Sequence, residues 1–149
     1  MAMNTLNRKE SAVRTAISLL LGTVVAFVAG ALIGTQMVLA SVQSMGLDVT
    51  LAMRGASSLQ DLVGLGSSLL PLMAIALVPS WLILDWLSRR SILKANVLWY
   101  ALVGAASIGA LHPLLNVTLG VDVYAPARSW YGLFGQALAG GIGGLTVVR

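Results

Sequence analysis

Charged residues divide the 149-residue chain into four long apolar stretches. No Asp, Glu, Lys or Arg occurs in residues 15–47, 62–84, 95–121 or 129–148. Each stretch reaches the roughly 20 residues that a helix needs to cross about 30 Å of hydrocarbon. The pattern therefore predicts an all-α integral membrane protein: a four-transmembrane-helix bundle that forms a single domain over residues 1–149.

Composition supports a membrane protein over a soluble one. Hydrophobic residues make up 58% of the chain and charged residues 9%, with a mean hydropathy of +0.90, whereas about a quarter of a soluble domain is charged. The basic residues before the first stretch resemble a signal peptide, but that stretch far exceeds a signal core of about 7–15 residues. We therefore expect it to remain as a helix. Cysteine is absent, which excludes disulfide and iron–sulfur chemistry.

Basic residues predict the orientation. Only Arg54 and Arg128 lie in the first and third connections, whereas seven basic residues lie near the termini or in the second connection: Arg8, Lys9, Arg14, Arg89, Arg90, Lys94 and Arg149. Short segments rich in Lys and Arg stay in the cytoplasm, so we expect both termini there, in a bacterial inner (plasma) membrane. Because no basic stripe with interleaved aromatics occurs, we expect the lipid bilayer and no nucleic acid as a partner.

Aromatic residues fit the same four-helix arrangement. Trp and Tyr prefer the level of the lipid headgroups because one end is apolar and the other forms hydrogen bonds. All seven fall near the predicted membrane boundaries, four at the inner one (Trp81, Trp86, Trp99, Tyr100) and three at the outer one (Tyr124, Trp130, Tyr131).

A short motif recurs half a chain apart. Gly46-Leu47-Asp48-Val49, followed by Arg54, returns 74 residues later as Gly120-Val121-Asp122-Val123, followed by Arg128. A recurrence at half the chain length indicates tandem duplication, with two-helix repeats over 1–74 and 75–149. Chance similarity between two outward loops is the alternative. The charged residues of the two loops either order the loops, by pairing across the repeats, or shape an entrance. These residues are Asp48, Arg54, Asp122 and Arg128.

Helix boundaries and kinks follow from Gly and Pro. We expect Gly46 to end the first helix and the first outward loop to span about 46–58. Pro71 should kink the second helix and free the carbonyl of Ser67, because proline has no N–H to donate and its ring crowds that oxygen.

Small residues recur at four-residue spacing on the first and last helices. Such ridges let helix backbones approach closely. The candidate helix-packing residues are Gly22, Gly30 and Gly34, with Ala26 between them, and Gly132, Gly140 and Gly144, with Gln136 in the gap. The ridges either pack the bundle internally or form an interface between subunits.

Polar side chains gather in the predicted outer third of the membrane. They are Gln36, Ser67, Ser68, His112, Asn116 and Gln136. Polar groups at this depth usually face the bundle interior or a wet cavity, so the layer is either an outward-facing pocket or interhelical hydrogen bonding. His112 is the only histidine; it would either sense pH or sit as a structural side chain beside the kink at Pro113.

No Asp, Glu, Lys or Arg falls in mid-span, and the chain carries no nucleophile–base pair or metal-ligand cluster. We therefore expect no catalytic residues, cofactor or metal. Two hypotheses remain. The first is a non-catalytic membrane protein that acts as a homo-oligomer or as an assembly subunit of a larger membrane complex. The second is a small oligomeric channel or carrier lined by the outer polar layer.

Overall fold

The computed structural model describes residues 2–120 and 124–147, and within these ranges all side chains except those of 2–9, 119, 125 and 128. The described chain is helical throughout, apart from its connections. The elements are α1 (Ala2–Ser44), α2 (Leu51–Gly66), α3 (Leu69–Arg89), α4 (Val97–Leu119), the short 3-10 helix η1 (Ala125–Arg128) and α5 (Trp130–Leu145). The predicted all-α fold class is therefore confirmed.

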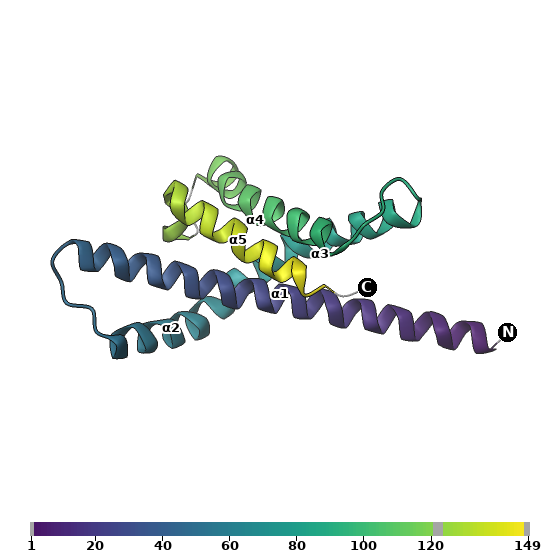
Figure 1. Cartoon of the computed structure of the whole chain (residues 1–149), viewed down its shortest axis with the longest axis horizontal. Helices are drawn as coiled ribbons and strands as arrows, with labels where there is room; N and C mark the ends of the chain where they lie inside the picture. Colours follow the sequence, from purple (N-terminus) through teal and green to yellow (C-terminus); the bar gives the residue numbers. More distant parts are fainter. Residues whose placement is uncertain (1, 121–123, 148–149) are drawn as a thin grey trace.

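The helices run up and down along a common direction (Figure 1). The chain passes along α1, returns through α2 and α3, runs out again along α4 and returns through α5. The α1–α2 and α4–α5 connections lie at one end of the bundle, which we call the hairpin end. The α3–α4 connection and the end of α5 point the other way, toward what we call the basic end because Arg89, Arg90 and Lys94 lie there.

In the part of the chain that the structure describes, three helices are long and apolar enough to cross a membrane, over Glu10–Ser44, Leu69–Arg89 and Val97–Thr118. These helices indicate a membrane-embedded protein. The fourth predicted span, 129–148, is represented by α5, whose 16 residues extend about 24 Å at 1.5 Å per residue. Because α5 ends at Leu145, the last helix is shorter than expected, and the four-span prediction is supported for three helices.

The second predicted helix is longer and broken. Residues assigned to the first outward loop, 46–58, instead start α2 at Leu51, where the Thr50 hydroxyl accepts a hydrogen bond from Met53 N at 3.2 Å. The helix then stops at Gly66 and restarts at Leu69. Pro71 explains the interruption: it lies in the first turn of α3, where a missing N–H costs nothing. The expected kink is thus a complete break.

Local capping sets the remaining boundaries. Gly46, just beyond α1, has φ +86°, and Gly120, which ends α4, has φ +65°; both fit glycine because this region disfavours a Cβ. At the helix starts, the Asn96 side chain accepts from Trp99 N and the Ser129 side chain accepts from Gly132 N. The predicted end of the first helix at Gly46 is confirmed.

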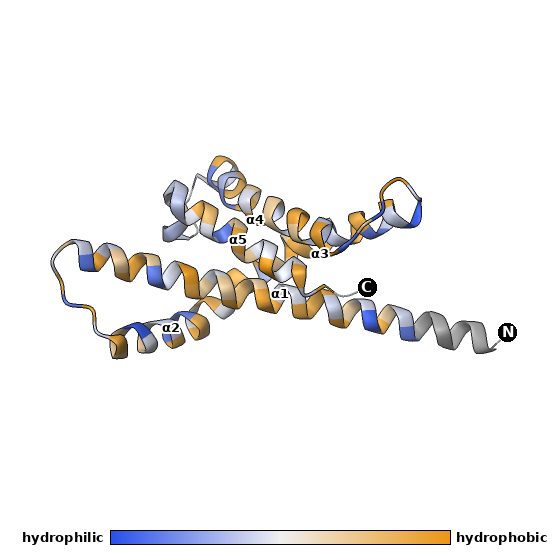
Figure 2. Cartoon of the chain, in the orientation of Figure 1, coloured by the Kyte–Doolittle hydropathy of each residue, from blue (hydrophilic) through white to orange (hydrophobic). Residues whose placement is uncertain are grey.

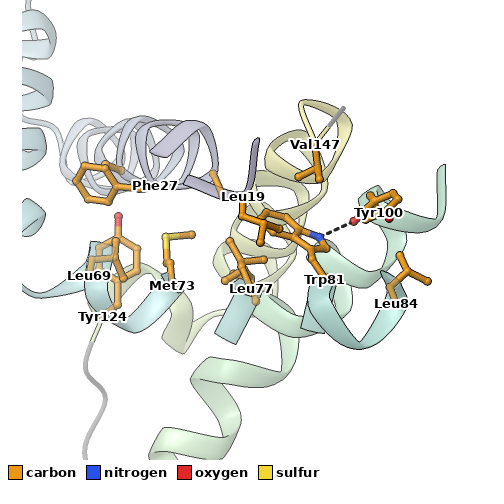
Figure 3. Packing of buried hydrophobic residues seen from close by; sticks show 13 residues of the cluster. Leu19, Phe27, Leu69, Met73, Leu77, Trp81, Leu84, Tyr100, Tyr124 and Val147 are labelled. Atoms are coloured by element: carbon orange, nitrogen blue, oxygen red, sulfur yellow. Dashed lines mark hydrogen bonds between the residues drawn. The ribbon is translucent and has the colours of Figure 1, made fainter. Parts of the chain in front are cut away.

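Three of the seven aromatics expected at the membrane boundary are core residues instead. Trp81 is fully buried on α3, with its indole N–H donating to the carbonyl of Tyr100 at 3.0 Å, and Tyr100 and Tyr124 are also buried (Figure 3). Sequence position gives the depth of a ring but not the face of its helix, which is why the burial of these three was not predicted. The exposed rings are Trp86, Trp99, Trp130 and Tyr131.

Helix α5 lies between α1 and α4 and contacts both through backbone. Toward α4, a Cβ on Gly140 would collide with the Gly104 backbone, and one on Gly144 would collide with the Tyr100 backbone. Toward α1, a Cβ on Gly143 would collide with the Gly22 carbonyl. Glycine is required at these positions because the helix axes are too close for any side chain.

The outside of the bundle is apolar. Hydrophobic colours dominate the middle of α1, α3 and α4, whereas hydrophilic residues concentrate on α2, the adjacent part of α1 and the α3–α4 connection (Figure 2). Large apolar side chains on every long helix are exposed, among them Leu20, Ile75, Leu102 and Phe134. This surface suits lipid, in agreement with the three candidate spans.

Replacing Gly140 with Ala should destabilise the bundle. The added Cβ would press on the Gly104 backbone and lie 2.8 Å from Ile108 Cγ1, so overpacking should lower the free energy of unfolding by about 1–3 kcal/mol. Gly141→Ala is the matched control, because its Cβ would meet its nearest atom at an ordinary 3.5 Å. Thermal unfolding in detergent measures both; equal stability of the two variants would contradict the close approach of α4 and α5.

Candidate functional site

A polar network joins α2 to the end of α1. The guanidinium of Arg54 donates to Gln36 Oε1 at 2.7 Å and to Gln43 Oε1 at 2.9 Å. Gln36 Nε2 in turn donates to the Ser58 hydroxyl at 3.1 Å. The Gln36 amide is therefore engaged through both of its ends, and Arg54 is held by two helix side chains.

A second link lies one turn away. The Thr35 hydroxyl donates to Asp61 Oδ2 at 2.6 Å, and it also lies 2.8 Å from the Ala31 carbonyl oxygen. Arg54, Ser58 and Asp61 are spaced by four and three residues, so they share one face of α2. That face meets α1, which places the polar side of α2 inward.

Beyond α1, a buried group of three polar side chains surrounds the carbonyl of Gly30. Gln136 Nε2 donates to this oxygen at 3.0 Å, and the Tyr124 hydroxyl approaches it at 3.4 Å. The ring of His112 stacks on Tyr124, with 5.9 Å between centroids and 28° between planes. Figure 3 shows the Tyr124 hydroxyl directed toward α1, near Phe27 and Leu69.

Glycines on α1 make room for this group. A Cβ on Gly30 would lie 2.8 Å from Gln136 Oε1, and a Cβ on Gly34 would overlap the Tyr124 hydroxyl. Thr35, which binds Asp61, follows Gly34 directly. Residues 30–36 of α1 thus connect the α2 network to the Tyr124 group, which together we call the hairpin-end polar site.

Two buried atoms of this site have no hydrogen-bond partner among the described residues: His112 Nε2 and Gln136 Oε1. Gln136 is fully buried and His112 is 8% exposed. Unpaired polar atoms are rare inside proteins because each forgoes its hydration without a replacement bond. The site therefore has hydrogen-bonding capacity that the fold itself does not use.

The structure separates the six residues predicted as a polar pocket. Gln36 lies in the α2 network, and His112 and Gln136 lie in the buried group. Ser67 and Ser68 are exposed at the α2–α3 break, and Asn116 is exposed on α4. The outer polar layer is therefore two linked clusters on opposite sides of α1, without the serines.

The predicted glycine ridges have contacts within the chain. Gly22, Gly140 and Gly144 meet neighbouring helices, Gly30 and Gly34 meet the polar site, and Gly132 meets the carbonyl of Pro126. Of the repeat-loop charges, Arg54 binds the glutamines of α1 and Asp48 is exposed. Asp122 and the side chain of Arg128 lie outside the described residues, so the proposed pairing across the repeats stays a prediction.

Sequence reasoning missed Thr35, Asp61 and Tyr124 at this site. Asp61 shares a polar face of α2 with Arg54 and Ser58. This spacing was hidden because residues 46–58, which include Arg54 and Ser58, were assigned to a loop. Tyr124 was assigned to the membrane boundary, and its burial depends on Gly34, 90 residues earlier in the chain. Within the described ranges no group of three His, Cys, Asp or Glu side chains is placed to hold a metal.

Comparison of the chain with protein-family models, curated proteins and solved structures finds no match. The functional argument therefore rests on the geometry.

Stability should fall at high pH through Tyr124. Burial, aided by the nearby Asp61 carboxylate, raises the pKa of Tyr124 to about 12 from about 10 in an unfolded chain. The fold favours the neutral phenol, so this contribution is complete below about pH 10 and is lost as pH rises through about 12. Thermal unfolding in detergent between about pH 9 and 12 measures the loss.

Tyr124→Phe should lose less stability over that pH range than the unmodified protein. Tyr131→Phe is the control, because the Tyr131 side chain is exposed and its removal should leave the pH profile unchanged. Identical profiles for Tyr124→Phe and the unmodified protein would mean that Tyr124 is not buried as described.

Proposed function

We propose that this chain is a non-catalytic integral membrane protein that acts as a homo-oligomer, and that its copies associate through the outward face of α2. Its four helical passes cross the membrane with both termini in the cytoplasm. The observation that carries the proposal is the arrangement of α2, which turns its polar side toward α1 and its apolar side away from the protein.

None of the α2 residues is buried, although eight of the 16 are apolar and three more are glycine. Leu51 is 86% exposed and Val63 is 83% exposed, whereas Arg54 and Asp61 are engaged by α1. In a water-soluble helix the opposite distribution is expected. The outward face of α2 therefore requires an apolar neighbour, either lipid or protein.

The same face carries small residues. Ala52, Ala56 and Gly64 follow one another at multiples of four residues, and all three are exposed. Gly55 and Gly64 have no atom within 4 Å of an added Cβ. Small residues at this spacing favour close helix–helix contact in membranes. The glycines of α1 and α5 already have partners inside the chain, so α2 offers the unpartnered face.

A second copy covers this face better than lipid alone. Helix α3, at 21 residues, already suffices to cross the hydrocarbon by itself, and α2 precedes it at the hairpin end. The α1–α2 hairpin also extends past the α4–α5 connection (Figure 1). Its apolar exterior therefore reaches beyond the compact part of the bundle, where contact with another hairpin would shield it.

The proposed topology uses α5 as a short fourth crossing. Its neighbours α1 and α4 shield it through the glycine contacts, so a length of about 24 Å is tolerable where a lipid-exposed helix would need about 30 Å. The basic end then faces the cytoplasm, as its Lys and Arg residues predict. A bacterial inner membrane is the setting we propose for this orientation.

Single cysteines test the association face, because the chain has none of its own. Purified Val63→Cys protein in liposomes should form a disulfide-linked dimer on mild oxidation. Ile75→Cys is the matched control: Ile75 is 70% exposed but lies on α3, and it should stay monomeric. In liposomes of purified protein, only a second copy is available as the partner.

Two results would contradict the proposal. One is a monomeric particle mass across a wide range of protein-to-lipid ratios. The other is equal cross-linking of the Val63 and Ile75 variants, which would indicate random collision. Labelling of the Val63 variant from outside intact cells checks the orientation separately.

A channel or carrier is the second candidate, and the unpaired His112 Nε2 and Gln136 Oε1 favour it. If a polar solute uses these atoms, liposomes containing the protein should conduct a small neutral solute, and Gln136→Leu should reduce the flux at least several-fold. Gln36→Leu, which alters only the α2 network, is the control. Folded protein without flux would exclude this function.

A further inference from the structure

A second polar site lies at the basic end of the bundle, at the opposite end from the hairpin-end polar site. A cavity of about 380 Å³ opens between the end of α3, the start of α4 and the residues after α5. Its polar lining comes from Asp85, Ser88 and Arg89 on α3, from Asn96 and from Tyr100. The volume lies at the lower end of the roughly 300–1,000 Å³ typical of ligand pockets.

Two of the acceptor atoms around this cavity are used by the fold. Asp85, which is 8% exposed, accepts a hydrogen bond from the Tyr100 hydroxyl through one of its carboxylate oxygens. The Asn96 side-chain oxygen accepts from Trp99 N at 3.1 Å. These contacts position both residues and engage one oxygen of each, and the same lining also carries hydrogen-bond donors.

Three side chains and the start of α4 supply the hydrogen-bond donors. Arg89 supplies a guanidinium, Ser88 a hydroxyl and Asn96 its amide nitrogen. The first turn of α4 also begins here, at Val97 in the cavity lining, and a helix N-terminus carries a partial positive charge. A guanidinium, neutral donors and a helix N-terminus together match a phosphate group, which has acceptors only.

The surroundings point to the source of that phosphate. Arg90 and Lys94 lie in the adjacent α3–α4 connection, and Arg90 stacks over the Trp86 ring at 4.9 Å. An exposed Trp with a cation over it suits the headgroup level of a bilayer. Basic pockets between membrane helices at this level are typical sites for lipid phosphates.

We propose that the cavity binds the phosphate of a phospholipid headgroup, with Arg89 as its charged ligand and Ser88 and Asn96 as hydrogen-bond donors. Asp85 is a positioning residue: through Tyr100 it ties α3 to α4 and so fixes the width of the cavity. The proposal is independent of the association through α2, since it uses the opposite end of the bundle.

Native mass spectrometry of delipidated, full-length protein tests the proposal. The probes are phosphatidylglycerol and diacylglycerol with the same acyl chains, which differ in the phosphate-containing headgroup. Phosphatidylglycerol should bind at least about tenfold more tightly than diacylglycerol. Equal binding of the two lipids would overturn the proposal.

Neighbouring arginines provide a matched pair of variants. Arg89→Gln should weaken phosphatidylglycerol binding about tenfold, and Arg90→Gln, which removes the same charge from a residue outside the cavity, should change it less than about twofold. Equal losses in both variants would indicate attraction to diffuse positive charge and would overturn the site.

Asn96→Asp is a second variant that tests the site even if Arg89→Gln does not fold. Aspartate preserves the cap on α4, but its charge should repel the phosphate and weaken binding while the unfolding temperature stays unchanged. Unchanged phosphatidylglycerol affinity in this variant would contradict the site. Glycerol 3-phosphate distinguishes the sources: displacement of the lipid shows that a free phosphate ester suffices, and retention shows that the intact lipid is the ligand.

Discussion

Close backbone contact around α5 is the constraint on which the rest of the structure depends. Gly140 and Gly144 bring this helix against α4, and Gly143 brings it against Gly22 of α1. Lipid is as apolar as the side chains, so helix association in a membrane relies on such packing and on hydrogen bonds. Because α5 holds α1 on one side and α4 on the other, it determines where the polar residues of both helices meet.

Residues 30–36 of α1 then face two polar neighbourhoods. Gly30 and Gly34 receive the side chains of Gln136 and Tyr124, while Thr35 and Gln36 bind α2. These hydrogen bonds keep Arg54 and Asp61 away from lipid, where exposed charges are costly. The same arrangement leaves the apolar face of α2 outward, so the internal hydrogen bonds and the proposed association through α2 have one cause.

Sequence patterns predicted the helical fold well because hydrophobicity and charge determine which segments enter a membrane. Three of the four spans and the stop at Gly46 follow from them. The patterns failed where the outcome depends on contacts between distant segments. The burial of Trp81 was not predicted, because the sequence gives the depth of its ring in the membrane but not the helix face on which the ring lies. The contacts of Asp61 and Tyr124 were not predicted, because their partners, Thr35 and Gly34, are distant in sequence.

Helix α2 turns its polar side toward α1, and cross-linking between two introduced cysteines measures this orientation directly. In the structure Gln36 and Ser58 are hydrogen-bonded at 3.1 Å, and Leu59 is 67% exposed, rotated by about 100° from Ser58. We expect an efficient intramolecular link from a short thiol cross-linker in Gln36→Cys/Ser58→Cys and little in Gln36→Cys/Leu59→Cys. A stronger link in the second variant would contradict this orientation, because α2 would then present its apolar side to α1.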